Sequence, residues 1–560
     1  SGCGSTQQNP GGNHGGDSGS GMNNDGSPLQ DRTILEVRQL MTTKVDVLLS
    51  IDNLRSMKDK QDILAQSLPY LVQRLITPRC VRDCEPADNC TVRQQVEGIP
   101  LGFLSDPDGN CQGGSAEMTP LRDLHLGVVS SSLGAHGAAT AGDLCVRSSD
   151  NDHARLLGSI RPVSGTFKDI GFLAWDTRRV DAEPAADHDP KAFVDKAIQL
   201  VQSAGEDGCE LEATLEAWYR FLIDPAPPQQ IALEDNLARA QGVDSTVLEQ
   251  RAAFLRPDSA VVIGMLSDEN DCSIVDEGYG WLAARMAPMY GSTSQCAVNP
   301  NDPCCTSCAA GDAAVGCPPP SSDPSCQATT LPAEADAPGL RCFHQKARFG
   351  MDLLYPIARY HDGLTNPVVP DGNGTMVQNP LFAAAEGTLP RDRGLVHLLS
   401  IIGVPWQDIA DFDSLTGATG LRFMAPAELS SSGRWDVVVG DPSASPPQLP
   451  TDPFMLESVD ERTGNNPIAQ DGIVQSSATS PKANTINGHE LKNVTSDELQ
   501  FACIFPLPTP RDCATAPADV ACDCTQTDIA KNSPLCQPPA GGPADTTQYY
   551  AQAYPGTRFL

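Results

Sequence analysis

Residues 45–61 read VDVLLSIDNLRSMKDKQ and join an apolar run to an aspartate, a short polar loop and a charged helix start. A continuous apolar run of this length is typical of a strand that is buried on both faces of a sheet. Residues 58–76 follow with apolar side chains at helical spacing. The stretch therefore predicts a strand, a loop and a helix, and polar turns of this kind often hold a divalent cation.

Other apolar runs predict more strands, at residues 121–134, 171–176, 259–271, 394–405 and 434–442. Two further helices are expected at residues 190–205 and 210–223. Strands that alternate with helices predict an α/β fold, an open, doubly wound and mostly parallel sheet with helices on both faces. The working site of such a sheet lies at the carboxyl ends of its strands. The acids that follow strands there are Asp52, Asp268, Glu269 and Asp271.

The composition is that of an acidic chain rich in loops and cysteine. With 38 Lys and Arg against 71 Asp and Glu, the formal charge is −33. This charge argues against nucleic acid or an anionic membrane surface as the partner, because both bind basic faces. The 20 cysteines lie mostly in loops rich in Pro, Gly and Asp, which favours disulfides in an oxidising compartment over zinc sites.

The chain divides by composition into five parts, because its 560 residues are too many for one core. Residues 44–272 and 394–442 are expected to form one α/β domain, which a Cys-, Pro- and Gly-rich insertion at 273–393 interrupts. Residues 443–560 are expected to be an irregular Cys-rich extension. Residues 1–43 are rich in Gly, Ser and Asn.

The start of the chain, Ser-Gly-Cys followed by a polar tract, resembles the end of a bacterial lipoprotein signal. Residues 1–43 would then be a flexible tether with a lipid on Cys3; the alternative is a plain disordered tail. We expect an outer-membrane lipoprotein or cell-surface protein of a Gram-negative bacterium, held to the membrane only through Cys3. The other 19 cysteines are an odd number, so one is free or pairs beyond the chain.

The strand-end residues resemble those of the von Willebrand factor A (VWA) domain. The first motif of that family is Asp-x-Ser-x-Ser after strand one, and its last is a strand ending in Thr-Asp-Gly. Here VLLSIDNLRSM supplies Asp52 and Ser56, with Leu54 at the first Ser position, and VVIGMLSDEN supplies Asp268. Phrases such as GCELEATLEAWYRFL, SDENDCS and IIGVPWQDIA are similar to large VWA-like lipoproteins of myxobacteria, whose chains continue past the region that matches Leu560.

The resemblance implies a metal-ion-dependent adhesion site, in which Mg²⁺ or Ca²⁺ is held by oxygen ligands and bridges to an acidic residue of a protein partner. Glu210 or Glu212 would replace the family's Thr ligand. With Glu210 in that role, the implied metal ligands are Asp52, Ser56, Glu210 and Asp268. The site is degenerate, because Leu54 removes a hydroxyl and Arg55 repels a cation. The alternative is that the two aspartates only cap loops and helix starts.

Two other groups of residues stand out. The stretch SDPDGNCQGGSAE has the spacing of a weak calcium loop at Asp106, Asp108, Asn110 and Glu117, and the favoured alternative is an Asp/Gly turn tied by Cys111. Cys209 and Cys272 belong to neighbouring strand-end loops, so we expect them to form a disulfide. Histidines are scattered and no Gly-x-Ser-x-Gly elbow is present, which argues against an enzyme.

We therefore expect a protein without catalytic activity that mediates protein–protein interaction or adhesion at the bacterial cell surface, with a divalent cation as its cofactor if the degenerate site retains one. A disulfide-stabilised structural subunit of a surface assembly or filament, which would self-assemble, is the first alternative. A metal-dependent hydrolase is the second. The interaction surface is the strand-end face around Asp52.

Overall fold

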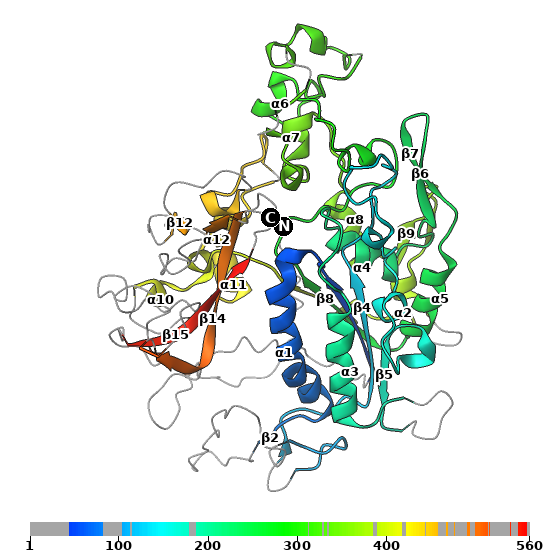
Figure 1. Cartoon of the computed structure of the whole chain (residues 1–560), viewed down its shortest axis with the longest axis vertical. Coiled ribbons are helices and arrows are strands. Elements are labelled where there is room, and N and C mark those ends of the chain that lie inside the picture. Colours follow the sequence, from blue (N-terminus) through cyan, green and yellow to red (C-terminus); the bar gives the residue numbers. More distant parts are fainter. Residues whose placement is uncertain are drawn as a thin grey trace, which may run out of the picture.

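A computed structural model of the chain is shown in Figure 1. It describes residues 44–81, 104–111, 115–178, 186–311, 313–327, 330–332, 335–384, 389–416, 422–442 and 444–456. It also describes shorter stretches, at 466–468, 475–476, 490–492, 499–512, 514–515, 538 and 547–556. Cys3 and its predicted tether lie outside the described residues.

A five-stranded sheet forms the centre of the fold. Its strands are β1 (Lys44–Ile51), β4 (Asp123–Ser130), β5 (Leu173–Asp176), β8 (Ala260–Leu266) and β11 (Val396–Ile401). The order across the sheet is β11-β8-β1-β4-β5; only β5 is antiparallel to its neighbour. The predicted α/β fold with a mostly parallel sheet is therefore confirmed, and β11 joins this sheet although the insertion separates it from β8 in sequence.

The direction in which the chain crosses the sheet changes at β1. From β1 the chain proceeds to β4 and β5 on one side, and it then crosses to β8 and β11 on the other. In the central register Leu48 of β1 lies opposite Gly127 of β4 and Ile263 of β8. The carboxyl ends of β1 and β8 thus flank the switch point, the place at which open α/β sheets bind their ligands.

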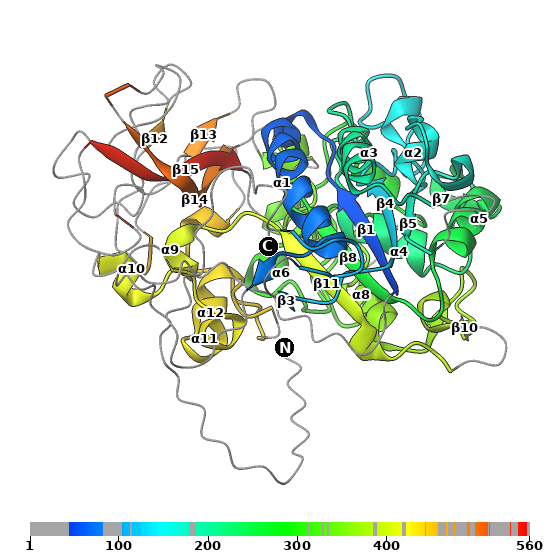
Figure 2. The same ribbon diagram turned by 90° about the horizontal axis from the view of Figure 1, so that it is seen from below.

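Helices cover both faces of the sheet, as Figure 2 shows. One face carries α1 (Lys58–Ile76) and α3 (Pro190–Gln202), and the other carries α4 (Thr214–Leu222), α5 (Ser245–Phe254) and α8 (Ile357–Thr365). The start of α3 is specified locally, because the Asp189 carboxylate accepts a hydrogen bond from the Lys191 amide at 2.9 Å and Pro190 occupies the first helical position. The predicted helices are present, and the one expected from residue 210 begins at Thr214.

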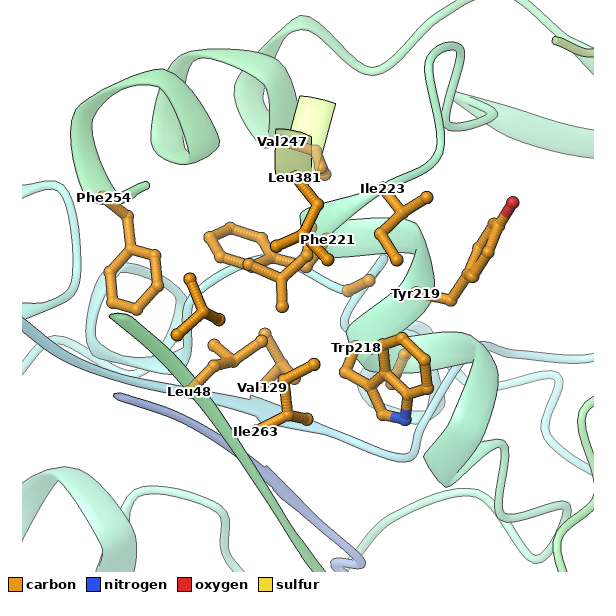
Figure 3. Packing of buried hydrophobic residues seen from close by; sticks show 14 of the residues in the cluster. Leu48, Val129, Trp218, Tyr219, Phe221, Ile223, Val247, Phe254, Ile263 and Leu381 are labelled. Carbon is orange, nitrogen blue, oxygen red and sulfur yellow. The ribbon is translucent and has the colours of Figure 1, made fainter. Parts of the chain in front are cut away.

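The face beneath α4 and α5 holds the larger core (Figure 3). Sheet residues Leu48, Val129 and Ile263 contact aromatic side chains of the helices, including Trp218 and Phe254, and all five are fully buried. The opposite face packs Ile51, Val128 and Trp175 against side chains of α1 and α3. Leu48 of β1 enters one core, while Val47 and Leu49 pack against the other, which is why the middle of this strand is apolar on both faces.

Two of the expected strands differ from the prediction. β11 was expected to be buried, but it lies at the sheet edge, where Leu398 is 41% and Ile401 59% exposed. Residues 434–442 were expected to form a strand and instead form helix α12 (Arg434–Val438) between the left-handed residues Gly433 and Gly440. A short apolar run does not distinguish strand from helix, and nothing in β11 itself indicates its edge position.

The first part of the insertion is held together by disulfides and lies at one end of the molecule, with α6 (Ser294–Val298) and α7 (Gln345–Phe349) at the top of Figure 1, whereas α8 further along the insertion packs on the sheet. Its bonds are Cys272–Cys342, Cys296–Cys305, Cys304–Cys317 and Cys308–Cys326. Two further bonds lie elsewhere, Cys80–Cys111 and Cys145–Cys209. These disulfides indicate an oxidising, extracytoplasmic environment. Among the described helices, none has the length and apolar character that a membrane span requires.

The extension expected to be irregular contains a four-stranded sheet. Its strands are β12 (Gln475–Ser476), β13 (Glu490–Lys492), β14 (Leu499–Asp512) and β15 (Gln548–Gly556). Prolines argue against a strand in a sequence, but β14 contains several and its register with β15 shifts between Pro506 and Arg511. The remaining helices and strands are β2 (Cys80–Val81), β3 (Ser115–Ala116), α2 (Leu157–Ile160), β6 (Gln230–Glu234), β7 (Leu237–Gln241), β9 (Val368–Pro370), β10 (Met376–Gln378), α9 (Trp406–Ile409), α10 (Phe412–Thr416) and α11 (Pro426–Ser431).

Candidate functional site

The candidate site lies at the switch point, where backbone hydrogen bonds continue past the ends of the strands. The Asp52 amide donates to the Leu266 carbonyl at 2.9 Å, and the Ser267 amide donates to the Ile401 carbonyl at 3.3 Å. These bonds hold the loops after β1 and β8 side by side. We call Asp52, Ser56, Lys60, Ser267 and Asp268 the strand-end site.

The Asp52 carboxylate is fully buried and bound on both oxygens. Its Oδ2 accepts a hydrogen bond from the Ser267 hydroxyl at 2.7 Å, and its Oδ1 accepts one from the Leu54 amide at 3.1 Å. The Gln61 side chain donates to the Asp52 carbonyl at 2.9 Å. Asp52 therefore orders the loop between β1 and α1 through bonds within the protein.

The Asp268 carboxylate is bound by the start of α1. The Ser56 hydroxyl donates to Asp268 Oδ1 at 3.1 Å, and Lys60 Nζ lies 3.0 Å from Asp268 Oδ2. The same ammonium donates to the Ser56 carbonyl at 2.8 Å. The side chains of Lys60 and Asp268 are only 14% and 4% exposed. A positive charge supplied by the chain itself thus lies beside the acid that was expected to bind a metal cation.

The structure brings together three of the four predicted metal ligands and places Glu210 elsewhere. Glu210 is exposed, and with the nearer Asp150 it raises the pKa of Arg147. No hydrogen bond or ion pair joins Glu210 to Asp52, Ser56 or Asp268 among the described residues. In that part of the chain, no three or more His, Cys, Asp or Glu side chains are grouped so that they could hold a metal ion.

Sequence analysis considered Leu54 and Arg55 and missed Lys60. Leu54 is half-buried and Arg55 is exposed. The position of Lys60 could have been predicted from its spacing in the sequence. Lys60 follows Ser56 by four residues, and residues four apart at the start of a helix lie on the same side. A lysine at that spacing from a motif serine indicates that an ammonium can reach the site.

Asn53 connects the site to the loops after β4 and α3. Its side-chain oxygen accepts a hydrogen bond from the Ser132 hydroxyl at 2.8 Å, and its amide nitrogen donates to the Ala204 carbonyl at 3.2 Å. The Ser132 hydroxyl in turn accepts from the Cys209 amide at 2.9 Å. These buried bonds make the strand-end face a fixed surface rather than a set of independent loops.

The predicted disulfide between Cys209 and Cys272 is wrong. Cys209 pairs with Cys145 in the loop after β4, and Cys272 pairs with Cys342 in the insertion. The two loops are adjacent, since the Cys272 amide donates to the Glu212 carbonyl at 2.7 Å. The prediction that the two loops are adjacent is therefore correct. Each of the two cysteines nevertheless pairs with a cysteine of another segment, and sequence spacing does not show which cysteine that is.

Removal of the Cys145–Cys209 disulfide gives the first prediction. The bond joins residues 64 apart, so its loss frees a long loop in the unfolded chain. We expect the double change Cys145→Ser and Cys209→Ser to lower the free energy of unfolding by about 2–4 kcal/mol, measured by urea denaturation. Cys296→Ser with Cys305→Ser, residues only 9 apart, is the control with a smaller effect. Unchanged stability of the first variant would contradict the prediction.

The weak calcium loop is not assembled as its spacing suggested. Asp106 accepts hydrogen bonds from the Asp108 amide at 3.0 Å and from the Asn110 amide at 2.8 Å, which makes a local turn. Glu117 instead receives two hydrogen bonds from Arg74, at 2.7 and 2.8 Å. Cys111 forms a disulfide with Cys80. The structure therefore matches the alternative reading, an Asp/Gly turn tied by Cys111.

A buried ionic network lies behind the site and supports α4. Glu216 of α4 accepts two hydrogen bonds from Arg359 of α8, both at 3.0 Å. Arg220, one turn further along α4, donates to Asp276 at 2.5 Å, and His136 Nδ1 lies 3.2 Å from the same carboxylate. The network joins α4 to α8 and to the start of the insertion.

The acids after β8 differ in role from Asp268. Asp271 accepts hydrogen bonds from the Leu215 amide at 2.8 Å and the Ser273 hydroxyl at 3.0 Å, so it binds the first turn of α4. Burial raises the pKa of Asp271 to about 6, against the effect of these hydrogen bonds. Glu269 is buried beside Ser267. The role of Asp271 is therefore to hold the first turn of α4, and its hydrogen bonds are not made to the strand-end site.

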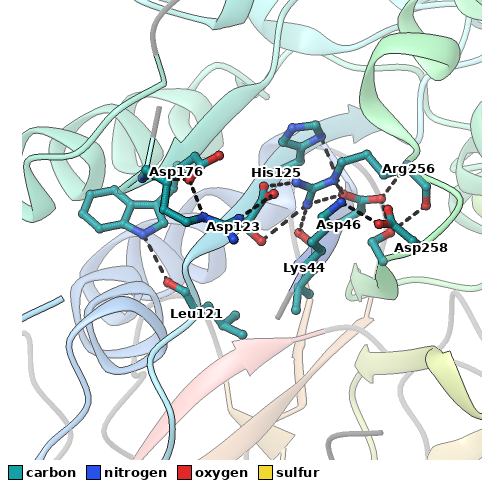
Figure 4. Close-up of polar contacts among 12 residues, drawn as sticks. Lys44, Asp46, Leu121, Asp123, His125, Asp176, Arg256 and Asp258 are labelled. Carbon is teal, nitrogen blue, oxygen red and sulfur yellow. Dashed lines mark hydrogen bonds and ion pairs between the residues drawn. The ribbon is translucent and has the colours of Figure 1, made fainter. Parts of the chain in front are cut away.

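The opposite end of the sheet carries a second polar cluster, shown in Figure 4. Arg256 donates to Asp46 through its amide and its Nε, both at 2.8 Å, and pairs with Asp123. His125 Nδ1 lies 2.7 Å from the Phe254 carbonyl, and burial followed by the charge of Arg256 lowers the pKa of His125. The charged and polar groups of this cluster pair with one another at the amino ends of the strands. We therefore interpret the cluster as a support of the fold.

Comparison with protein-family models, with curated protein sequences and with solved structures finds no match to this chain. The fold class is α/β with a mostly parallel sheet, and the site is a pair of acids at the switch point that accept hydrogen bonds from hydroxyls of the protein, while the Lys60 ammonium pairs with Asp268. Function is therefore argued from this geometry and from the sequence motifs.

Proposed function

We propose that this protein is an extracytoplasmic, VWA-like interaction module that binds a protein partner through its strand-end face without a divalent cation. The observation that carries the proposal is the ion pair of 3.0 Å between Lys60 and Asp268, at the position where the sequence motif leads one to expect a metal. The topology supports the proposal, because both aspartates follow the two strands that flank the switch point.

Electrostatics decides between the ammonium and a metal ion. A divalent cation about 4 Å from the Lys60 charge would be repelled by about 8 kcal/mol at an effective dielectric constant of 20. Binding with a micromolar dissociation constant supplies about 8 kcal/mol in total. A divalent cation would therefore have to displace Lys60, which also donates to the Ser56 carbonyl. The ammonium is the favoured cation at this site.

The partner would be recognised by the surface around the site. Arg55 is exposed in the loop that Asp52 orders, and it presents a positive charge on a chain whose formal charge is −33. An acidic side chain of a partner would be attracted to this residue. Disulfides on both sides of the face, at Cys209 and Cys272, hold the neighbouring loops in place. A fixed surface lowers the entropy cost of binding.

Calorimetry with Mg²⁺, Ca²⁺ and Mn²⁺ tests the proposal. We expect no binding heat with the native protein, because Lys60 neutralises Asp268. The variant Lys60→Met removes the charge and leaves two aspartates and two hydroxyls, so it should gain measurable affinity for a divalent cation. Lys191→Met is the matched control, because Lys191 pairs with Asp195 on the exposed face of α3, far from the site in sequence and structure.

A native protein that binds a divalent cation, and loses this binding in Asp268→Ala, would contradict the proposal and favour a metal-dependent adhesin.

A structural subunit of a surface assembly is the second candidate function. The observation in its favour is edge strand β11, which exposes Leu398 and Ile401, since exposed edge strands pair readily with other chains. Sedimentation over a range of concentrations separates the candidates: assembly of the native chain favours the subunit.

A further inference from the structure

We propose that Asp408 and Asp452 share one buried proton and thereby form a pH-sensitive latch in the segment that follows β11. Asp408 belongs to α9, Asp452 precedes residues 453–455, and Asn466 lies between the two carboxylates. The three residues are far apart in sequence, so the latch holds three separate segments together.

The geometry comes from Asn466. Its side-chain nitrogen donates to Asp408 Oδ1 at 2.8 Å and to Asp452 Oδ2 at 3.0 Å. Its side-chain oxygen accepts from the Ile468 amide at 3.0 Å, which fixes the orientation of the amide group. One nitrogen therefore bridges both carboxylates and brings them together.

The surroundings do not favour two charges. Asp408 and Asp452 are both 0% exposed, and Asn466 is 1% exposed. Two carboxylates that share a dry site cannot both be ionised at small cost, so one of them keeps its proton. A proton held by one of the two acids removes the second negative charge from the site.

The other charged groups around Asp408 do not replace the proton. Arg434 of α12 acts on Asp408, but its guanidinium donates to the backbone carbonyls of Gln407 and Asp408, at 3.0 and 2.9 Å. Arg422 pairs with Asp411 and Glu428, and Asp436 of α12 is exposed. Burial, followed by the neighbouring Asp452, raises the pKa of Asp408 to about 8, far above its ordinary value of 3.8.

The direction of the pH effect follows from this increase. The folded segment holds a proton that the unfolded chain releases near pH 4, so the proton stabilises the closed latch at low pH. This contribution decreases as the pH rises above 4 and is lost as the pH passes through 8, when the pair must carry two charges. The segment should therefore open in alkaline solution and stay closed in neutral or acidic solution.

Hydrogen exchange of the full chain, followed by mass spectrometry and corrected for the intrinsic pH dependence, tests the latch. Between about pH 5 and pH 8 we expect peptides that contain residues 406–409 and 452–455 to lose about tenfold in protection per pH unit and to level off above pH 8, while peptides of α3 keep theirs. In Asp452→Asn, the amide bonds to Asp408 without a titrating proton, so the pH at which protection falls should shift or disappear. Asp408→Asn is the second test of the same pair, and Asp436→Asn is the exposed control that should match the native protein.

Two results would overturn the proposal. Protection of these peptides that does not change between pH 5 and pH 8 in the native chain would show that no shared proton holds the segment. Protection that calcium chloride restores at pH 9 and that EDTA removes would show that a divalent cation, and not a proton, occupies the pair. The native chain alone gives both readouts, so the test stands even if a variant does not fold.

Discussion

Replacing Arg256 with methionine will lower the free energy of unfolding by about 3–5 kcal/mol, because it leaves the buried carboxylate of Asp46 without its arginine and leaves Asp123 to the more exposed Arg178, at 3.6 Å. Asp46 is fully buried, and Arg256 is the residue that joins the amino ends of β1 and β4 to the end of α5 (Figure 4). Removing one partner of a buried pair costs more than the pair itself contributes, since the remaining charge stays desolvated. Urea denaturation of the native and variant chains measures the difference.

The control for Arg256 is an arginine in an exposed ion pair. Arg239 lies 3.1 Å from Glu277, and the two side chains are 48% and 53% exposed. We expect no resolvable change in stability for Arg239→Met, because water and salt screen such a pair. If Arg256→Met were as stable as Arg239→Met, the cluster at the amino ends of the strands would not be a support of the sheet.

The sequence predicted most of the central sheet because its strands carry their own signal. β1, β4 and β8 each contain a run of mainly apolar residues, and each is followed by polar loop residues at the carboxyl end of the sheet. The same signal gave a wrong prediction of burial for β11. An apolar run shows that a strand can be buried, but it does not show whether helices cover that strand. The position of a strand in the sheet is decided by residues that are distant in sequence.

The candidate site was predicted in part for the same reason. Asp52, Ser56 and Asp268 follow strand ends, so their convergence follows from a parallel sheet. Glu210 was assigned by analogy with a loop position, and loop conformation is not set by periodicity. The Lys60 ammonium and the partner of Cys209 depend on side-chain directions across three loops, which the sequence of any one loop does not determine.

The second large effect is expected from Asp276→Asn in the buried network behind α4. At pH 7 this change should lower the free energy of unfolding by about 3–5 kcal/mol, because Arg220 then loses its nearer carboxylate in the interior and keeps the more distant one of Glu216, at 3.7 Å. Arg220 and Asp276 are both nearly inaccessible to solvent, at 4% and 6% exposure of their side chains. His136 and Tyr355 also contact the Asp276 carboxylate, so the change affects four buried groups.

The pH dependence of this variant distinguishes a charge effect from simple misfolding. Burial alone would raise the pKa of Asp276, but Arg220 and His136 outweigh it and hold that pKa well below its usual range. The folded state therefore binds the Asp276 proton less readily than the unfolded chain does. The resulting stability is fully present above about pH 4 and decreases as the pH falls below 4.

The difference in stability between the native chain and Asp276→Asn should consequently be largest near pH 7 and shrink in acid. Urea denaturation at a series of pH values from 7 to 3 measures this difference directly. Asp362→Asn is the control, since Asp362 pairs with His361 at the surface, where its side chain is 54% exposed. A difference that stays constant down to pH 3 would mean that packing, and not the charge of Asp276, accounts for the loss. A difference that shrinks in acid would identify Asp276 as the residue that keeps Arg220 paired behind the strand-end face.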